Sequence, residues 1–94
     1  MAYHVYIVTN KKNGVLYIGV TKDIARRAYE HKYKLVKGFS ARYNLDKIVL
    51  LEEYTSINEA IAREKQLKHW NRAWKIELIE SVNPEWDDYY SGLA

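Results

Sequence analysis

The chain contains 94 residues, of which 48% are hydrophobic, and it has no cysteine. A chain of this length can bury one core but not two, so we expect a single domain over residues 1–94. The lack of cysteine excludes disulfide bonds and thiolate zinc sites, and no apolar run approaches the roughly 20 residues that a membrane-spanning helix requires. The start lacks the features of a secretion signal, which predicts a cytoplasmic protein without a membrane partner.

The charge is divided unevenly along the chain, although the net formal charge is only +3. Residues 1–47 carry ten Lys and Arg against three Asp and Glu, a net charge of +7. Residues 48–94 carry five against nine, a net charge of −4. A basic half of this kind favours an anionic partner such as nucleic acid, but an ordinary solvated surface is the alternative.

The first predicted elements form a β-hairpin. β-branched and aromatic side chains dominate two segments, residues 3–9 and 15–20. Asn13-Gly14 between them is typical of a reverse turn. If these two residues alone form the turn, Tyr6 and Tyr17 lie on the same face of the sheet, whereas a wider turn allows either arrangement. Two tyrosines on one face indicate a functional pair or ordinary cross-strand packing.

A helix is predicted next, beginning after Thr21 or Asp23 and running to about Leu35. The side-chain oxygens of Thr21 and Asp23 can accept hydrogen bonds from the free amides of the first turn. Helical spacing predicts a buried stripe of Ile24, Ala28 and Leu35. Arg27 and His31 lie one turn apart on or beside this stripe. A single buried histidine is usually satisfied by the core, but an Arg beside it requires an acceptor or a ligand.

The second half of the chain predicts one more strand and two helices. A loop over residues 37–45, marked by Gly38, precedes an apolar run at residues 48–51, which we interpret as the third and most buried strand. Ser56 and Glu59 then have the spacing of a capping box at the start of a helix. A last helix is predicted over residues 72–80.

The predicted end of that helix is Asn83-Pro84, because the residue before a proline is forced out of helical geometry. Beyond it the tail is acidic and aromatic. We expect Trp86 to pack back on the domain and the last few residues to fray.

Glu64 occupies a position where a hydrophobic residue would be expected. It lies in the middle of a helical stripe with a spacing of three and four residues, formed by Ile57, Ala60, Ile61, Leu67 and Asn71. An unpaired carboxylate that faces a core is costly, so such a residue usually binds a metal, pairs with a base or takes part in chemistry. The alternative is an ion pair with Lys68, one turn later, at the rim of the stripe.

These polar residues supply the parts of metal-assisted phosphodiester hydrolysis. A carboxylate can hold one Mg²⁺ ion whose other ligands are water and phosphate oxygens, and such an ion activates water and binds the phosphate. An Arg offers a planar fork to a phosphate oxygen. A tyrosine oxygen or an imidazole can remove a proton from the attacking water.

The same residues resemble the signature of the GIY-YIG nuclease superfamily. His4-Val5-Tyr6 stands in the place of the first triplet and Tyr17-Ile18-Gly19 is the second, with ten residues between Tyr6 and Tyr17. The pattern continues at Val20, Thr21, Arg27, His31, Glu64, Trp70, Lys75 and Asn83-Pro84-Glu85-Trp86. The resemblance covers nearly the whole chain and is greatest to the small, single-domain bacterial branch.

The resemblance implies a small α+β domain, with a three-stranded antiparallel sheet flanked by helices, that cuts nucleic acid with one divalent ion, Mg²⁺ or Mn²⁺. Glu64 would be the metal ligand and Arg27 would stabilise the phosphate charge. Tyr6 or Tyr17 would be the general base or position the attacking water, and His31 would tune a tyrosine or relay a proton. Because a free tyrosine has a pKa near 10, either tyrosine needs help to act near neutrality.

Three positions depart from the family pattern. His4 replaces the glycine of the first triplet, and Val20 stands where the excision-repair nucleases carry a lysine, which excludes a lysine-assisted base there. Asn83 is the best counterpart of a late asparagine in the family, although it lies farther beyond Glu64 than in the excision-repair branch.

The sequence therefore predicts a structure-selective DNA endonuclease linked to repair or recombination. The alternatives are a nucleic-acid-binding module with little cleavage of its own, and a protein-interaction module that uses an aromatic surface of Trp70, Trp74 and Trp86. The sequence leaves open the substrate structure, the identity of the base, the metal, the pathway, any protein partners and the oligomeric state.

Overall fold

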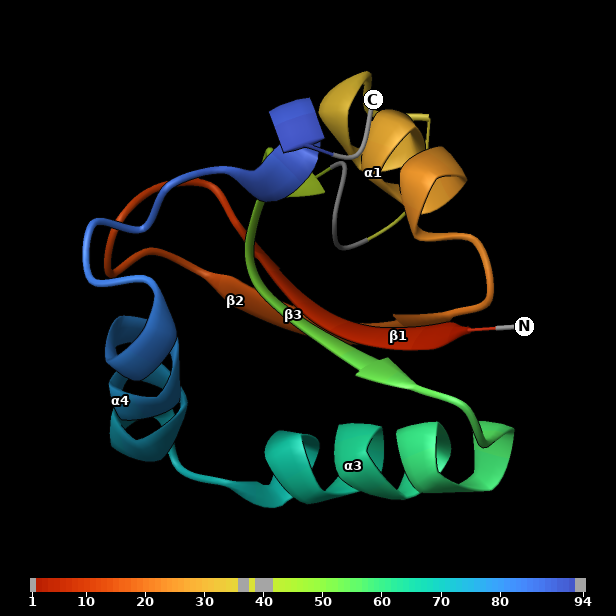
Figure 1. Ribbon diagram of the computed structural model, residues 1–94. Helices are drawn as coiled ribbons and strands as arrows, with labels where there is room; N and C mark the ends of the chain where they lie inside the picture. Colours follow the sequence, from red (N-terminus) through yellow and green to blue (C-terminus); the bar gives the residue numbers. More distant parts are fainter. Residues whose placement is uncertain (1, 36–37, 39–41, 93–94) are drawn as a thin grey trace.

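Figure 1 shows the computed structural model, a curved sheet with helices packed on both of its faces. The structure describes residues 2–35, 38 and 42–92, so parts of the predicted loop over residues 37–45 and the end of the predicted tail lie outside the described residues. The elements are β1 (Tyr3–Thr9), β2 (Leu16–Thr21), α1 (Ile24–Lys32), β3 (Lys47–Tyr54), α3 (Ile57–His69), α4 (Arg72–Val82) and the 3₁₀ turn η1 (Tyr89–Gly92). None of the helices described is long and apolar enough to cross a membrane.

The three strands are antiparallel and run in the order β2-β1-β3. This arrangement confirms the predicted α+β class with a three-stranded antiparallel sheet. The prediction that the third strand is the most buried is wrong, because β1 is the central strand and β3 pairs on one side only. β2 is the other edge strand, and its free edge is where the polar residues gather.

The hairpin turn is the wider of the two alternatives that the sequence left open around Asn13-Gly14. The last pair of the ladder joins Thr9 to Leu16, and the amide of Gly14 donates to the carbonyl of Lys11 across 2.9 Å. Asn13 adopts a left-handed φ of 59°, which asparagine tolerates better than most residues. The register pairs Tyr6 with Gly19 and Val8 with Tyr17, so both tyrosines share a face, which is one of the two arrangements that a wider turn left open.

The sheet separates two hydrophobic layers. Tyr6 and Val8 of β1 point to the side of α1, where they pack with Ile24, Ala28, Leu45 and Ile48. Val5 and Ile7 point to the side of α3 and α4, where they pack with Ile18, Val49, Leu50, Ala60, Leu67, Ile79 and Trp86. A shift of register in β3 at Ile7/Val8 leaves one extra residue on that strand, so that Val49 and Leu50 both contribute to the second layer.

Helix α1 begins as predicted but ends earlier. The Asp23 carboxylate accepts a hydrogen bond from the amide of Arg26 (3.1 Å), which confirms the predicted cap. At the other end Lys34 adopts a left-handed φ of 59°, and the amides of Lys34 and Leu35 bond back to the carbonyls of His31 and Glu30. This reversal places Leu35 outside the helix with 59% of its surface exposed, so its predicted place in the buried stripe is wrong.

Helices α3 and α4 follow the sequence more closely. The Ser56 hydroxyl accepts a hydrogen bond from the amide of Glu59 (3.4 Å), as the capping-box spacing predicted. Helix α4 continues to Val82, two residues beyond the predicted end, and stops at Asn83. Trp86 is buried as predicted, and its indole N–H donates to the Glu80 carboxylate across 2.8 Å.

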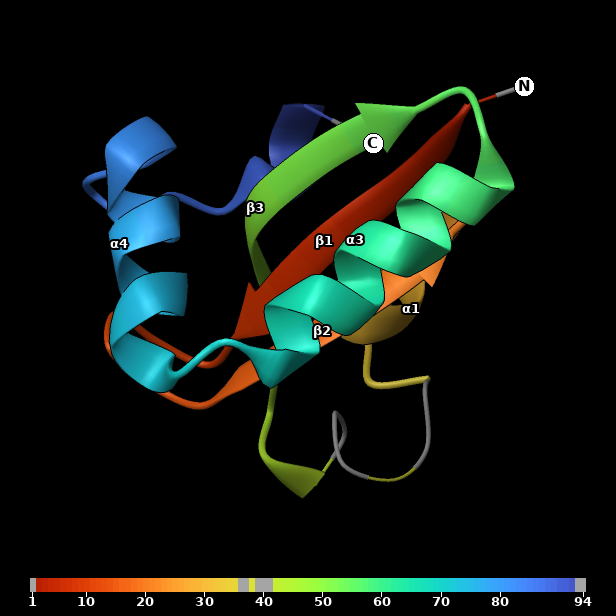
Figure 2. The same cartoon turned by 90° about the horizontal axis from the view of Figure 1, so that it is seen from below.

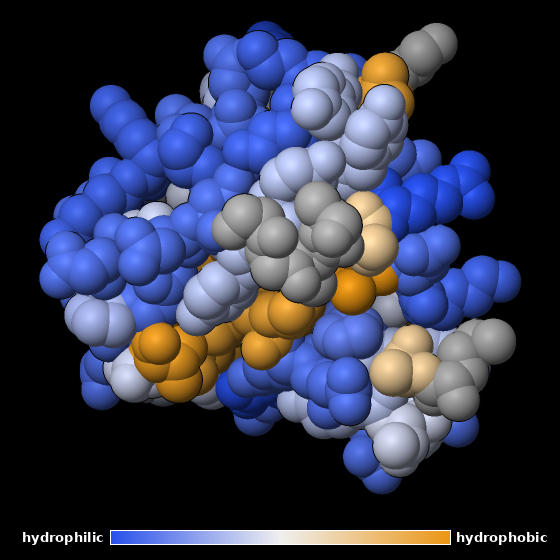
Figure 3. All heavy atoms as spheres, turned by 45° about the horizontal axis from the view of Figure 1, so that its top comes forward, coloured by the Kyte–Doolittle hydropathy of each residue, from blue (hydrophilic) through white to orange (hydrophobic). Residues whose placement is uncertain are grey.

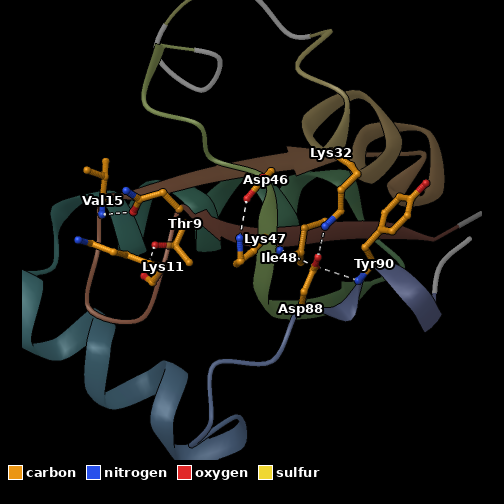
Figure 4. Close-up of polar contacts among 10 residues, drawn as sticks. Thr9, Lys11, Val15, Lys32, Asp46, Lys47, Ile48, Asp88 and Tyr90 are labelled. Carbon is orange, nitrogen blue, oxygen red and sulfur yellow. Dashed lines mark hydrogen bonds and ion pairs between the residues drawn. The ribbon is translucent and has the colours of Figure 1, made fainter.

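Asp88 fastens the tail to both α1 and β3 (Figure 4). Its carboxylate accepts hydrogen bonds from the Lys32 ammonium (2.6 Å) and from the amides of Ile48 (3.1 Å) and Tyr90 (3.0 Å). These contacts hold η1 against the face that carries α1. Figure 3 views this face, where hydrophilic residues predominate and hydrophobic residues show in a narrow band between them.

We expect Asp88→Ala to lower the free energy of unfolding by about 1–3 kcal/mol, because it leaves two backbone amides and an ammonium without their acceptor. Urea unfolding followed by tryptophan fluorescence measures the change. Asp87→Ala is the matched control, because it removes the same charge from the exposed neighbouring position and should cost less than about 0.5 kcal/mol. Equal losses in the two variants would contradict the role of Asp88.

Candidate active site

The predicted residues meet in a cleft at the free edge of β2. Helix α1 covers one face of the sheet and α3 covers the other, and both reach this edge, as the view in Figure 2 shows. The cleft has a volume of about 150 Å³ and is lined by Tyr6, Tyr17, Gly19, Val20, Arg27, His31 and Glu64. The structure therefore brings together five of the six predicted site residues.

Gly19 makes this arrangement possible. A Cβ atom at position 19 would overlap the Cζ and hydroxyl oxygen of Tyr6, which is its partner in the β1–β2 ladder. Without that atom, the Tyr6 ring can lie close to the backbone of the edge strand and extend into the cleft. The glycine of the second triplet is therefore required by a close approach, and not by an unusual backbone conformation.

Tyr6 and His31 form the buried floor of the cleft. The Tyr6 hydroxyl and the His31 Nε2 atom are 3.3 Å apart, and the two rings meet edge to face with centroids 5.6 Å apart. Only 3% of Tyr6 is exposed. Burial raises the pKa of Tyr6 to about 12, and the neighbouring Tyr17 adds to this effect, whereas Arg27 opposes it. Tyr6 therefore keeps its proton near neutrality unless a neighbour accepts it.

His31 is such a neighbour, because its imidazole is held in the neutral form. Burial lowers the pKa of His31 below 6.5, and the positive charge of Arg27 lowers it further, whereas Glu30 opposes the shift. As the pH falls from 6.5 towards this lowered pKa, the unfolded chain takes up the proton first, so the stability contributed by His31 declines in that range. Above it, the neutral imidazole can accept a proton from Tyr6 in the tautomer that carries its hydrogen on Nδ1.

Tyr17 lies at the open side of the cleft. It is on the edge strand β2, with 36% of its surface exposed, and its ring centroid is 6.4 Å from that of His31. The two tyrosines therefore differ in access, since Tyr6 is enclosed by the core and Tyr17 faces solvent.

Glu64 lies at the rim of the cleft and is paired. Its carboxylate is 3.3 Å from the Lys68 ammonium, the i,i+4 pair that the helical spacing allowed, and 17% of its side chain is exposed. The two interpretations of Glu64 therefore coexist, because the same carboxylate lines the cleft and contacts Lys68. The helical stripe that was predicted around Glu64 is only partly buried, because Ile57 is exposed. Asn71, its last predicted member, lies beyond α3 and caps α4.

The donor set fits a hydrated divalent cation. Within the described ranges, no three His, Asp or Glu side chains gather as a ready-made metal cage. A single carboxylate beside an open cleft suits Mg²⁺, which keeps several waters and takes its remaining ligands from substrate phosphate oxygens. Glu64 is the residue of the cleft that could hold such an ion.

Asn83, the sixth predicted residue, does not line the cleft. Its amide nitrogen donates to the carbonyls of Val49 (3.0 Å) and Asp87 (2.9 Å), and its amide oxygen accepts from the Asp87 amide (3.0 Å). Asn83 thus satisfies the backbone at the irregular point of β3 and ties it to the end of α4. We therefore leave Asn83 out of the site.

Sequence reasoning missed Glu30. This carboxylate lies 3.4 Å from Arg27 and 3.6 Å from Arg26, so it pairs with the guanidinium that borders the cleft. The signal was present in the sequence, because Glu30 follows Arg27 by three residues and therefore lies on the same side of the helix.

A family profile described as the GIY-YIG catalytic domain matches residues 2–77, a range that includes every residue lining the cleft. The chain therefore belongs to the GIY-YIG family, and a domain of this family implies nuclease activity on nucleic acid. The resemblance that was stated from the two triplets, Arg27, His31 and Glu64 is confirmed.

Within that family the chain is similar to bacterial UPF0213 proteins. It is 30% identical over 84 residues to UPF0213 protein SERP0126 of Staphylococcus epidermidis, which covers 85% of this chain and 98% of that protein. It is 33% identical over 81 residues to UPF0213 protein SSP2268 of Staphylococcus saprophyticus, and the match covers 82% of this chain and 93% of that protein. The solution NMR structure of UPF0213 protein BH0048 from Bacillus halodurans matches with a TM-score of 0.56 and 28% identity, covering 88% of this chain and 87% of that chain.

We expect an NMR titration to place the pKa of His31 below 6.5 and to show that Arg27→Gln raises it, because the variant removes a nearby positive charge. Arg26→Gln removes the same charge from a more exposed position on α1 and should leave the pKa of His31 nearly unchanged. A wild-type value at or above 6.5, or equal shifts in both variants, would contradict this electrostatic description of the cleft.

Proposed function

We propose that this chain is a divalent-metal-dependent endonuclease that hydrolyses phosphodiester bonds in DNA, with branched, flapped or damaged DNA of repair or recombination as its substrates. One observation carries the proposal: Tyr6, Tyr17, Arg27, His31 and Glu64 line one cleft in a chain of the GIY-YIG family. Such a set suits phosphate chemistry, whereas a module that only bound nucleic acid would have no use for a carboxylate in its phosphate site.

Glu64 is the proposed metal ligand. Mg²⁺ or Mn²⁺, when bound there, supplies a Lewis acid for the scissile phosphate. The Lys68 ammonium already lies 3.3 Å from this carboxylate, so the position beside Glu64 accommodates positive charge. Arg27 borders the same space and contributes a fixed guanidinium, which would stabilise the charge that develops on the phosphate oxygens.

The Tyr6–His31 pair is the proposed route for the proton. Because the pKa of Tyr6 is raised to about 12, a free phenolate is not formed near neutrality. The neutral His31 Nε2, 3.3 Å away, can instead accept the hydroxyl proton while the Tyr6 oxygen takes a proton from the attacking water. Tyr17, at the open side, would orient that water or the phosphate.

The size of the cleft supports selection by structure. A volume of about 150 Å³ admits one phosphate and its immediate surroundings. A compact domain of this kind offers little surface for reading a long base sequence, which depends on many contacts in the grooves. Recognition of a junction, a flap or a distorted site requires less of that surface.

We expect Glu64→Gln to reduce Mg²⁺-dependent cleavage by about 100-fold or more, because the variant keeps the shape of the side chain and removes the charge that holds the ion. The assay uses duplex, flap, fork and single-stranded DNA with Mg²⁺ or Mn²⁺. Glu77→Gln, an exposed site on α4, is the matched control and should cleave like the wild type. If Glu64→Gln cleaved at the wild-type rate, the proposed metal role of Glu64 would be refuted. If the wild-type protein bound all of these substrates but cleaved none, a nucleic-acid-binding module would be favoured.

We expect Tyr6→Phe and His31→Gln each to lower the cleavage rate constant by about 100-fold or more, and the double variant to be no slower than either one. The reason is that one hydroxyl and one imidazole would act in series on the same proton. Single-turnover rates measure this, with melting temperatures to check folding and Tyr29→Phe, an exposed tyrosine outside the cleft, as the control. The proposed route would be contradicted if the two rate reductions multiplied in the double variant. It would also be contradicted if Tyr17→Phe greatly lowered the cleavage rate constant and Tyr6→Phe did not.

A further inference from the structure

A second hollow adjoins the cleft along the start of α1. It has a volume of about 400 Å³ and is lined by Val20, Thr21, Lys22, Asp23, Arg26, Arg27 and Glu30. Val20 and Arg27 line both spaces, so the hollow and the cleft lie next to each other. We call this space the Lys22–Arg26 hollow, after the two cations that belong to it alone.

The charges of the hollow favour an anionic occupant. Lys22 is exposed, and Arg26 has 77% of its side chain exposed, so both can move to meet a ligand. Of the two carboxylates on the wall, that of Asp23 already accepts a hydrogen bond from the first turn of α1. The other, Glu30, is shared between Arg26 at 3.6 Å and Arg27 at 3.4 Å. Three cations therefore face two carboxylates, each of which is already engaged.

We propose that the Lys22–Arg26 hollow binds the backbone phosphates next to the scissile phosphate, so that the DNA strand leaves the cleft along the start of α1. This inference rests on the proposed function, because it takes the scissile phosphate to lie in the cleft. It assigns to Lys22 and Arg26 a role in holding the strand and not in the chemical step.

The shared wall of the two spaces supports this path. Successive nucleotides of one strand rise by only about 3.4 Å along a duplex, so a strand anchored in the cleft places its next phosphates within a short distance of it. The hollow begins at Arg27, the residue proposed to contact the scissile phosphate. Its walls carry three cations, two carboxylates and a hydroxyl, and its lining includes no aromatic ring, which suits contact with a backbone and not the stacking of bases.

Glu30 is the positioning residue between the two sites. It bridges Arg26 and Arg27 and lines the hollow but not the cleft. Its negative charge opposes an incoming phosphate, and its carboxylate pairs with Arg27, which also lines the cleft. A phosphate in the hollow can replace Glu30 as the partner of Arg26 and leave the pairing with Arg27 in place.

The test is DNA binding by fluorescence anisotropy in EDTA, with a labelled duplex and a labelled flap over a series of NaCl concentrations. Lys22→Gln and Arg26→Gln should each weaken binding about three- to tenfold and reduce the salt slope of log K by about 0.9 for each lost phosphate contact. Lys12→Gln removes the same charge from the exposed hairpin turn and should change the affinity less than twofold. Glu30→Gln should tighten binding, because it removes a carboxylate that faces the phosphate.

Equal affinities and salt slopes for Lys22→Gln, Arg26→Gln and Lys12→Gln would overturn the inference. The same variants are also tested for binding of polyglutamate. If Lys22→Gln and Arg26→Gln weaken the binding of polyglutamate but not of DNA, the inference is also overturned, because the occupant would then be an acidic polypeptide.

Because the measurement excludes metal and cleavage, the two proposals can fail separately. If the wild type cuts DNA while all the variants bind alike, this inference fails alone. If the variants differ as expected but no DNA is cut with Mg²⁺ or Mn²⁺, the proposed catalysis fails alone.

Discussion

The close approach of the Tyr6 ring to the backbone of Gly19 is the constraint on which the site depends. A side chain of any size on the edge strand at that point would displace the ring, and with it the hydroxyl that lies 3.3 Å from His31. Gly19 lies on an edge strand, where helices from opposite faces can contribute to one cleft. Arg27 and His31 come from α1 and Glu64 comes from α3, so the free edge of β2 gathers groups that the body of the sheet would otherwise separate.

Burial and charge act together on the two central groups of the cleft. For His31, burial and the charge of Arg27 both disfavour protonation, and the imidazole stays neutral. For Tyr6, burial disfavours the phenolate more strongly than Arg27 favours it, and the pKa rises to about 12. Tyr6 would therefore be a poor base by itself, whereas the neutral imidazole of His31 carries no proton on one ring nitrogen. Tyr6 keeps its proton and lies next to His31, which can accept one. The pair is therefore suited to passing a proton from Tyr6 to His31, which is the role that we propose for it.

The sequence predicted the parts of the structure that depend on local rules, and it failed where distant contacts decide. The caps at Asp23 and Ser56 follow from local hydrogen-bonding chemistry, and both are confirmed. The shared face of Tyr6 and Tyr17 depended on the width of the hairpin turn, which the sequence left open. The helix predicted to reach Leu35 stops earlier, because Lys34 adopts a left-handed conformation. A glycine is the usual sequence signal for that conformation, and this position has none. The order of the strands depends on which edge β3 pairs with, and no local pattern gives that information. Asn83 was assigned by resemblance, whereas its bonds to Val49 and Asp87 depend on an irregular strand that the sequence does not reveal.

The central claim is that Glu64 holds a divalent ion within reach of the two tyrosines, and paramagnetic line broadening by Mn²⁺ tests it most directly. In NMR spectra of the wild-type protein, substoichiometric Mn²⁺ should broaden first the amide signals around Glu64 and of Tyr17, Gly19 and Val20, which line the same cleft from another element. Glu64→Gln should abolish that pattern at the same Mn²⁺ concentration. Broadening centred elsewhere, for example on the acidic tail at Asp87 and Asp88, or an unchanged pattern in Glu64→Gln, would contradict the account.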